Sequence, residues 1–270
     1  MIKIYKDIIE LFKFKRKKYK IGFFVENKNI LEYLLPYIEI KSHREKIFII
    51  SFEDLDLQLK NVKIYTFHSN LIRELFFLIL NTRYLYSSTP GLNYNLFKRS
   101  KKYNCKYIFI QHSLCSMTMI YPSNSFDFFD AIQAVTNYQY KELHEIKKKN
   151  NLNFKVFKSN YLFLKNKVNQ FKQKSKKNVL IAPTWNTNFY DLNIHLEISK
   201  ILIQKNISFD IRPHPMSLKK NEVSLINLNK LNLSTNLSTN LNFFDYDLVI
   251  SDWSGIFIEF AVLGKKVLLV

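Results

Sequence analysis

The chain of 270 residues is about twice the size of a common domain, so it can hold two domains with substantial cores. Its 47% hydrophobic and 16% aromatic content, with only 4 Gly and 6 Pro, excludes a disordered or collagen-like chain. The sequence has 2 Cys, no signal-peptide pattern at its start, and no apolar run near the ~20 residues that span a bilayer. These features predict a cytoplasmic globular protein.

The formal net charge of +19 is carried by the first two thirds of the chain. Residues 178–270 contain 8 basic and 8 acidic side chains, so 33 of the 41 basic and 14 of the 22 acidic side chains lie in residues 1–177. This asymmetry predicts an anionic partner: a membrane surface, an anionic polymer or nucleic acid. Nucleic acid fits least, because the basic residues are dispersed over apolar strands. The alternative is an AT-rich genome that enriches lysine, although such a compositional bias would also make residues 178–270 basic.

Residues 1–20 are expected to form a basic amphipathic helix. Ile4, Ile8, Ile9, Leu11 and Phe12 fall near one side of such a helix. The cations that follow are Lys13, Lys15, Arg16, Lys17, Lys18 and Lys20. This pattern is typical of a helix that lies on anionic lipid headgroups, where each cation contributes on the order of 1 kcal/mol. We therefore expect a protein that is peripheral on the inner face of the cell membrane, with an ordinary solvated helix as the alternative.

Strands and helices alternate over residues 21–164, which predicts an N-terminal Rossmann-like domain whose parallel sheet is covered on both faces. The expected strands are 21–26, 47–52, 62–67, 84–88, 107–111, 131–136 and 155–158. The expected helices are 30–37, 70–80, 92–103 and 137–149.

A polar, basic segment at residues 165–177 is the expected linker, and the alternation restarts after it. The expected elements of the second Rossmann-like domain, residues 178–270, are strands 179–182, 209–212, 248–251 and 266–270 and helices 193–205 and 255–263. The repetitive stretch 231–242 is expected to be a surface loop. The fold class is therefore α/β, with two parallel-sheet domains in tandem.

Ligands of open parallel sheets bind beyond the carboxyl ends of the strands. Polar residues directly follow four of the expected strands, and these segments hold the candidate catalytic and donor-binding residues. The segments are His112–Ser113, Thr184–Trp185, Pro213–Pro215 and Asp252–Gly255.

The segment from Ser251 to Gly255 connects a strand to a helix, and its small residues would let free backbone N–H groups of that helix approach a phosphate. Ser254 could instead only cap the helix, which is worth ~1 kcal/mol. Glu259, one turn into the helix, could accept hydrogen bonds from ribose hydroxyls or could be an ordinary exposed glutamate.

His214 stands between two prolines, which restrict the backbone around it. Together with Arg212 it could bind a pyrophosphate, the imidazole through a hydrogen bond and the guanidinium through its positive charge. Arg212 could instead point into the outer face of the sheet. His112 could deprotonate an acceptor hydroxyl, because a histidine at its reference pKa of about 6.5 is largely neutral at physiological pH. A lone histidine is more often structural. Neither a metal-ligand spacing nor a Walker or complete GxGxxG loop occurs, so no metal or cofactor is expected.

Five short motifs give the chain a resemblance to a known family. They are Ser88-Thr89-Pro90-Gly91-Leu92, Ile110-Gln111-His112-Ser113, Ala182-Pro183-Thr184-Trp185, Arg212-Pro213-His214-Pro215 and Ser251-Asp252-Trp253-Ser254-Gly255, closing with Glu259 and Gly264-Lys265-Lys266. Over roughly residues 85–270, their order and spacing resemble the CDP-glycerol glycerophosphotransferase family of teichoic-acid and capsule synthesis. The chain departs from the family pattern at Ser113, where Gly is commoner, and at Trp253 and Gly255, where Tyr and Ser are usual.

The resemblance implies a GT-B fold, in which two Rossmann-like domains flank a cleft and the second holds the donor nucleotide. It implies an enzyme that moves a polyol phosphate from a CDP-activated donor to a lipid-linked or polymeric acceptor at the cytoplasmic face of the membrane. The family's candidate base falls on His112, and its pyrophosphate contacts fall on His214, Ser251 and Ser254. Because GT-B proteins continue beyond a strand such as 266–270, the second domain is expected to be incomplete.

Two other functions stay open at this point. The His-Pro and Ser-Asp-x-Ser-Gly elements recur in similar form in GT-B glycosyltransferases and nucleotide-sugar epimerases, which would take a nucleotide-sugar donor. A truncated second domain would also be compatible with a catalytically inactive binding protein.

Overall fold

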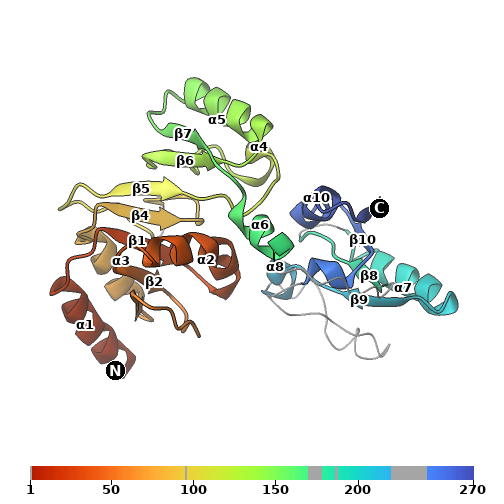
Figure 1. Ribbon diagram of the computed structural model, residues 1–270, viewed down its shortest axis with the longest axis horizontal. Helices are drawn as coiled ribbons and strands as arrows, with labels where there is room; N and C mark the ends of the chain where they lie inside the picture. The colour runs from red at the N-terminus through yellow and green to blue at the C-terminus, as the bar shows by residue number, and fades with distance from the viewer. Residues whose placement is uncertain (1, 95, 170–177, 186–187, 220–241) are drawn as a thin grey trace. The chain divides into compact units, whose positions relative to one another are not determined.

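The computed structural model describes residues 2–94, 96–169, 178–185, 188–219 and 242–270. The chain forms two compact units, residues 1–165 and 166–270, and each contains one parallel β-sheet with helices packed on it (Figure 1). The predicted α/β class with two Rossmann-like sheets is confirmed. Of the expected linker at 165–177, residues 165–169 belong instead to the helix Leu162–Asn169, and residues 170–177 lie outside the described residues, as does nearly all of the expected loop at 231–242.

Unit 1 is built on a seven-stranded sheet in the order β3-β2-β1-β4-β5-β6-β7, and each neighbouring pair is parallel. The strands are β1 (Ile21–Val25), β2 (Ile47–Ser51), β3 (Val62–Thr66), β4 (Tyr84–Ser87), β5 (Lys106–Phe109), β6 (Ala131–Ala134) and β7 (Lys155–Lys158). All the expected strands of this unit are confirmed. The order makes the carboxyl ends of β1, β4 and β5 direct neighbours, which is where the candidate residues of unit 1 lie.

Helices pack on both faces of this sheet (Figure 1). They are α1 (Ile2–Lys15), α2 (Lys28–Ser42), α3 (Asn70–Leu78), α4 (Met117–Ile120) and α5 (Asn137–Lys149). A further helix, α6 (Leu162–Asn169), begins at the end of unit 1 and extends beyond residue 165. A helix stands where the one at 1–20 was expected, but it ends at Lys15, so Arg16, Lys17, Lys18 and Lys20 follow it outside the helix. The helices expected at 30–37, 70–80 and 137–149 are confirmed, whereas α4 and α6 were not expected.

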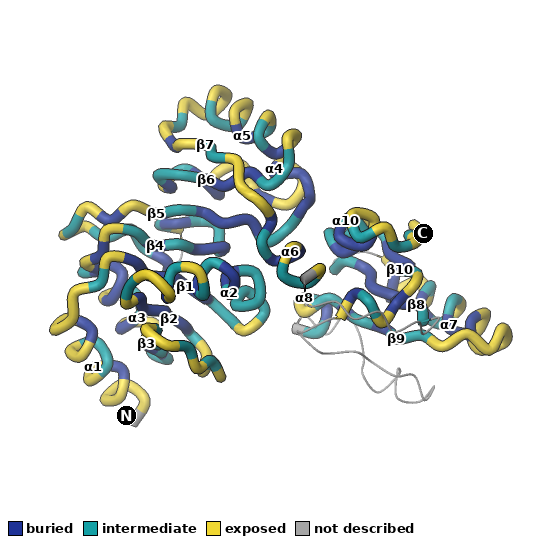
Figure 2. The backbone as a smooth tube through the Cα atoms, in the orientation of Figure 1, coloured by how far each residue is buried: buried dark blue, intermediate teal, exposed yellow. Residues whose placement is uncertain are grey.

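The core of unit 1 lies on both sides of β1 and β2, whose residues are all buried (Figure 2). Phe24 and Phe48 pack into the cluster on one face, and Phe23 and Ile49 into the cluster on the other. Burial on both faces explains why these strands read as continuous apolar runs. Gly22 lies under the ring of Phe48, and a Cβ atom there would come within 2.1 Å of that ring, so only glycine fits.

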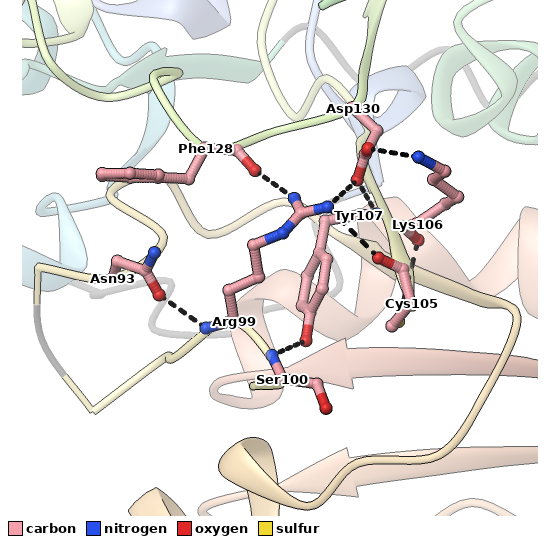
Figure 3. A network of polar contacts seen from close by, with 8 residues as sticks. All are labelled: Asn93, Arg99, Ser100, Cys105, Lys106, Tyr107, Phe128 and Asp130. Carbon is pink, nitrogen blue, oxygen red and sulfur yellow. Dashed lines mark hydrogen bonds and ion pairs between the residues drawn. The ribbon is translucent and has the colours of Figure 1, made fainter. Parts of the chain in front are cut away.

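The segment 92–103 is irregular in its described part, so the predicted helix is wrong. Asn93 has a left-handed backbone (φ 76°), which a right-handed helix does not accommodate. The guanidinium of Arg99 donates to the Phe128 carbonyl at 2.6 Å and pairs with Asp130 at 2.9 Å (Figure 3). The Ser100 backbone N–H donates to the hydroxyl of buried Tyr107 at 2.7 Å. Side chains therefore fix this segment against the amino end of β5, in place of helical hydrogen bonds.

Unit 2 is built on a parallel sheet in the order β11-β10-β8-β9. Its strands are β8 (Asn178–Ile181), β9 (Ser208–Ile211), β10 (Leu248–Ser251) and β11 (Lys266–Leu269), and its helices are α7 (Ile194–Gln204), α8 (Pro215–Lys219), η1 (Phe243–Asp245) and α10 (Gly255–Val262). The expected strands and both expected helices are confirmed. Ile181, Ile211 and Ile250 form its core with Phe189 and Leu202. Within the described ranges of both units, no helix has the length and apolarity to cross a membrane.

Candidate active site

His112 lies in the loop that follows β5, at the carboxyl edge of the unit 1 sheet. Its ring centroid is 5.8 Å from that of Tyr33, 5.9 Å from that of Tyr121 and 6.4 Å from that of Phe109. The Tyr121 hydroxyl is 3.4 Å from Nδ1 and 3.5 Å from Nε2 of the imidazole. These aromatic neighbours come from α2, from the end of β5 and from the segment after α4, and they cover part of the ring, so His112 is half-buried.

Burial lowers the pKa of His112 to about 4, and the hydrogen bond to the backbone of Ser88 only partly opposes this shift. The imidazole is therefore neutral throughout the physiological pH range. A neutral imidazole can accept a proton from a hydroxyl, which is the state that a general base requires.

One further polar residue, Glu26, lies at this edge and was missed from the sequence. Glu26 directly follows β1, and its carboxylate accepts a hydrogen bond of 3.0 Å from the Thr89 hydroxyl. Thr89 follows β4, which pairs with β1, and the Thr89 backbone N–H donates to the Ser87 hydroxyl at 2.9 Å. The position of Glu26 immediately after an apolar run was the signal that could have found it.

In unit 2, Asp252 joins the segments that follow β8 and β10. Its Oδ1 atom accepts hydrogen bonds from the backbone N–H groups of Thr184 at 2.8 Å and Ser254 at 3.1 Å. The hydroxyl of buried Ser251 donates to the Ala182 carbonyl at 2.6 Å. The predicted residues Thr184, Ser251, Asp252 and Ser254 are thus brought together, and Ser251 and Asp252 hold the two segments in place.

Ser254 stands at the N-cap position of α10, but its side chain makes no capping hydrogen bond to the helix. The interpretation of Ser254 as only a cap is therefore not supported, and the first turn beginning at Gly255 keeps unsatisfied N–H groups. Glu259 is buried, with 6% of its surface exposed, so it is not an ordinary exposed glutamate.

His214 follows β9 and precedes α8, which begins at Pro215. Its Nδ1 atom accepts a hydrogen bond of 3.1 Å from the Met216 backbone N–H. A neutral imidazole that accepts at Nδ1 carries its proton at Nε2, so Nε2 is the donor of this ring. The Trp185 ring lies 6.4 Å from the His214 ring. Arg212 is half-buried, and its backbone N–H continues the pairing of β9 with β8 through the Ile181 carbonyl at 2.9 Å.

A pocket with a volume of ≈ 590 Å³ opens beside Asp252 at the carboxyl edge of the unit 2 sheet. It is lined by Asn188, Phe189, Ile194, Asp252, Trp253, Phe257, Leu269 and Val270. Aromatic walls with one carboxylate suit a flat, hydrogen-bonding ring better than a phosphate. In the part of the chain that the structure describes, no three His, Cys, Asp or Glu side chains are grouped to hold a metal ion.

Two parallel-sheet units with polar segments at the carboxyl ends of their strands define a GT-B-like fold. Residues 6–269 match the family described as CDP-Glycerol:Poly(glycerophosphate) glycerophosphotransferase. The chain belongs to this family, and it is therefore a transferase of the glycerophosphotransferase class.

Solved structures support the fold assignment. The chain is similar to the wall teichoic acid polymerase TagF, with a TM-score of 0.60 and 14% identity over 99% of this chain and 75% of TagF. It is also similar to UDP-N-acetylglucosamine 2-epimerase from Rickettsia bellii, with a TM-score of 0.58 and 12% identity over 93% of this chain and 78% of the epimerase. The Methanocaldococcus jannaschii UDP-GlcNAc 2-epimerase gives a TM-score of 0.58 at 12% identity, over 92% of this chain and 82% of that one. Comparison with functionally curated proteins gives no match.

Proposed function

We propose that this protein transfers glycerol phosphate from CDP-glycerol to a lipid-linked or polymeric acceptor, in the synthesis of a teichoic-acid-like or capsule polymer. The observation that carries the proposal is the match of residues 6–269 to the glycerophosphotransferase family. The motif residues of this chain lie at the carboxyl edges of the two sheets, which supports the same proposal. A variant of TagF, whose fold is similar, has been solved after a soak with CDPG.

The donor pyrophosphate is assigned to unit 2. The backbone N–H of Gly255 at the start of α10 suits its oxygens, and the Ser254 N–H beside it is held by the Asp252 carboxylate at 3.1 Å. The Nε2 proton of His214 and the guanidinium of Arg212 add a hydrogen bond and a positive charge. The nucleoside is assigned to the pocket beside Trp253, and its ribose hydroxyls to Glu259.

The reaction is a displacement at phosphorus. The acceptor hydroxyl attacks the phosphorus that carries glycerol, a new O–P bond forms, and the bond from that phosphorus to the bridging oxygen breaks. CMP leaves with the electron pair of the broken bond, and the hydroxyl proton passes to the His112 imidazole. Such a base contributes ~10²- to 10⁴-fold to the rate. An anion bound beside the imidazole would raise its pKa from about 4 toward neutrality and so make it a stronger base.

A donor screen by calorimetry tests the proposal and separates it from its alternatives. CDP-glycerol is expected to bind, and UDP- and CMP-sugars are expected not to bind. The second candidate is a nucleotide-sugar glycosyltransferase or epimerase, which the similarity to UDP-N-acetylglucosamine 2-epimerase favours. Preferential binding of a UDP-sugar would replace the proposal with this candidate. Absence of both nucleotide binding and turnover would indicate a catalytically inactive binding protein.

We also propose that the protein is peripheral on the inner, anionic face of the cell membrane, and α1 is the main support. One side of α1 is docked on unit 1: Phe14 is buried, and the Asp7 carboxylate accepts the backbone N–H groups of His68 and Ser69 at 2.9 and 2.6 Å. The adjacent side is exposed (Figure 2). It is also apolar, since its exposed residues are Ile4, Tyr5, Ile8, Ile9 and Phe12. An exposed apolar stripe on a well-docked helix is typical of an interfacial helix.

The charge of unit 1 supports the same proposal. Exposed cations gather in the segments that lead into the strands, at the amino edge of the sheet; they are Lys17, Lys18, Lys20, Arg44, Lys46, Lys60, Arg83, Lys101, Lys102, Lys106 and Lys155. The segment after β2, at the carboxyl edge, carries exposed Glu53, Asp54 and Asp56 instead. The end of α1 leads directly into this basic amino edge. Exposed cations next to an apolar stripe suit an anionic lipid surface.

A further inference from the structure

The residue before His112 is fixed by a buried glutamine of β6. Gln133 accepts the Gln111 backbone N–H through Oε1 at 3.0 Å, and the Gln111 side chain donates to the Gln133 carbonyl at 2.9 Å. Both glutamines have no exposed surface. The pairing continues the link between β5 and β6 beyond the last residue of β5.

The residues after His112 are fixed by a second buried glutamine, Gln139 in the first turn of α5. Its Nε2 atom donates to the carbonyls of Ser113 at 3.1 Å and Cys115 at 2.8 Å, and its Oε1 atom accepts the Val135 backbone N–H at 3.1 Å. Gln139 has no exposed surface, and all three bonds join it to backbone groups. An amide is the side chain that can both donate twice and accept at such a place.

Glu142, less than one turn further along α5, fixes the end of the same loop. Its carboxylate accepts the Met117 backbone N–H at 2.8 Å and the Ser116 hydroxyl. The loop from Gln111 to Met117 is thus attached at successive backbone groups to β6 and α5, and His112 lies within this attached loop.

We infer that Gln139 is a positioning residue for His112: through the Ser113 and Cys115 carbonyls it holds the loop in the conformation that keeps the imidazole among Tyr33, Phe109 and Tyr121. The inference rests on the proposed role of His112 as the base. A displacement of 1 Å at a reacting group can cost ~10²-fold in rate, so a fixed loop has a direct catalytic value.

If Gln139 positions His112, the loss of Gln139 should change the pKa of the imidazole, which a purely structural role would not do. The titratable side chains packed on the imidazole are Tyr33 and Tyr121, and burial is what lowers its pKa to about 4. Without Gln139, the carbonyls of Ser113 and Cys115 lose their donor, the loop moves to hydrate them, and the half-buried ring becomes more exposed to water. The pKa of His112 should then rise toward its ordinary value.

The test measures the pKa of His112 by NMR in the full chain with labelled histidine, and the signal is assigned by its loss in His112→Ala. Gln139→Leu removes the three hydrogen bonds at similar volume. Thr82→Val is the matched control, because the buried Thr82 hydroxyl donates to the Tyr19 carbonyl at 3.1 Å at the opposite edge of the same sheet. Gln139→Leu is expected to raise the pKa of His112 by about 1 unit or more, and Thr82→Val is expected to leave it unchanged.

Turnover supplies a second readout. Gln139→Leu should lower kcat by ~10-fold or more and leave the KM for CDP-glycerol near the parent value, since the donor residues belong to unit 2. An unchanged pKa of His112 in a folded Gln139→Leu variant would overturn the inference. If that variant does not fold, Gln139→Asn, which withdraws the amide by one methylene, is measured in the same way. The NMR measurement does not depend on turnover. It therefore tests the position of Gln139 separately from the role of His112 as the base, which an active His112→Ala enzyme would disprove.

Discussion

The backbone N–H of Thr184 donates to the Oδ1 atom of Asp252 at 2.8 Å, although 68 residues separate the two in the chain. The same oxygen accepts the Ser254 backbone N–H at 3.1 Å. One carboxylate oxygen therefore sets the position of the segment after β8 relative to the start of α10. This relationship gives Asp252 a supporting function in the proposed phosphate site.

Asp252→Ala should weaken both the fold of unit 2 and its affinity for CDP-glycerol. Two partly buried N–H groups would lose their acceptor, at a cost of about 1–3 kcal/mol for each group left unsatisfied. Thermal unfolding and calorimetry with CDP-glycerol measure the two effects. Asp252→Asn is the control, because its amide oxygen can still accept at the Oδ1 position, and it should stay close to the parent in both measurements. Equal donor affinity in Asp252→Ala and the parent would remove Asp252 from the site.

His214→Ala should weaken CDP-glycerol binding by ~10- to 100-fold, which corresponds to the 1.5–3 kcal/mol of a hydrogen bond to a charged group. The physical reason is the Nε2 proton, which the Met216 backbone fixes by occupying Nδ1. Ser199→Ala is a matched control in the same unit, since the buried Ser199 hydroxyl only donates to the His195 carbonyl within α7. It should lower stability and leave donor affinity unchanged. A His214→Ala variant that binds CDP-glycerol as the parent does would place the pyrophosphate elsewhere.

His112→Ala should lower turnover by ~10²- to 10⁴-fold and leave the affinity for CDP-glycerol near the parent value, because a general base acts in the transition state. The parent should also show a defined pH dependence of kcat/KM. The neutral imidazole is the active form, and its pKa in the free protein is about 4, so kcat/KM should fall as the pH falls through about 4. If kcat/KM instead falls as the pH falls through about 6.5, the imidazole of His112 is solvated in the free enzyme.

The sequence predicted helices and strands well wherever the spacing of apolar residues fitted only one of the two. The strand Leu248–Ser251 and the helix Asn137–Lys149 have the boundaries expected from the sequence. The segment 92–103 also has a helical period, but the left-handed Asn93 and the interactions of Arg99 with Phe128 and Asp130 outweigh it. Such contacts join distant parts of the chain, and a local pattern contains no information about them.

His112, His214 and Asp252 were found because each follows an apolar run, and the end of a run can be seen in a single sequence. Their environment could not be found in this way. The low pKa of His112 depends on Tyr33 from α2 and Tyr121 from the segment after α4, and the hold on its loop depends on Gln139 from α5. The burial of Glu259 likewise follows from the packing of α10 and not from its own neighbours in sequence.

The proposed membrane surface is best tested by point substitutions on α1. Deleting residues 1–20 would remove buried Phe14 and Asp7, so a loss of binding could then reflect damage to the core. Phe12 is 59% exposed and can be changed without that damage. A phenylalanine that leaves water contributes about 1.5–3 kcal/mol, so Phe12→Glu should weaken binding to anionic vesicles by ~10-fold or more.

Ile201→Glu is the matched control, because Ile201 is 56% exposed on α7 of unit 2 and lies outside the proposed surface. Co-sedimentation with vesicles of anionic or neutral lipid compares the two variants with the parent. The parent should bind anionic vesicles more strongly than neutral ones, and raised salt should weaken this binding because the cations at the amino edge are exposed and screened. Equal binding to both kinds of vesicle, or equal losses in Phe12→Glu and Ile201→Glu, would show that α1 and the basic edge do not form a lipid-binding surface.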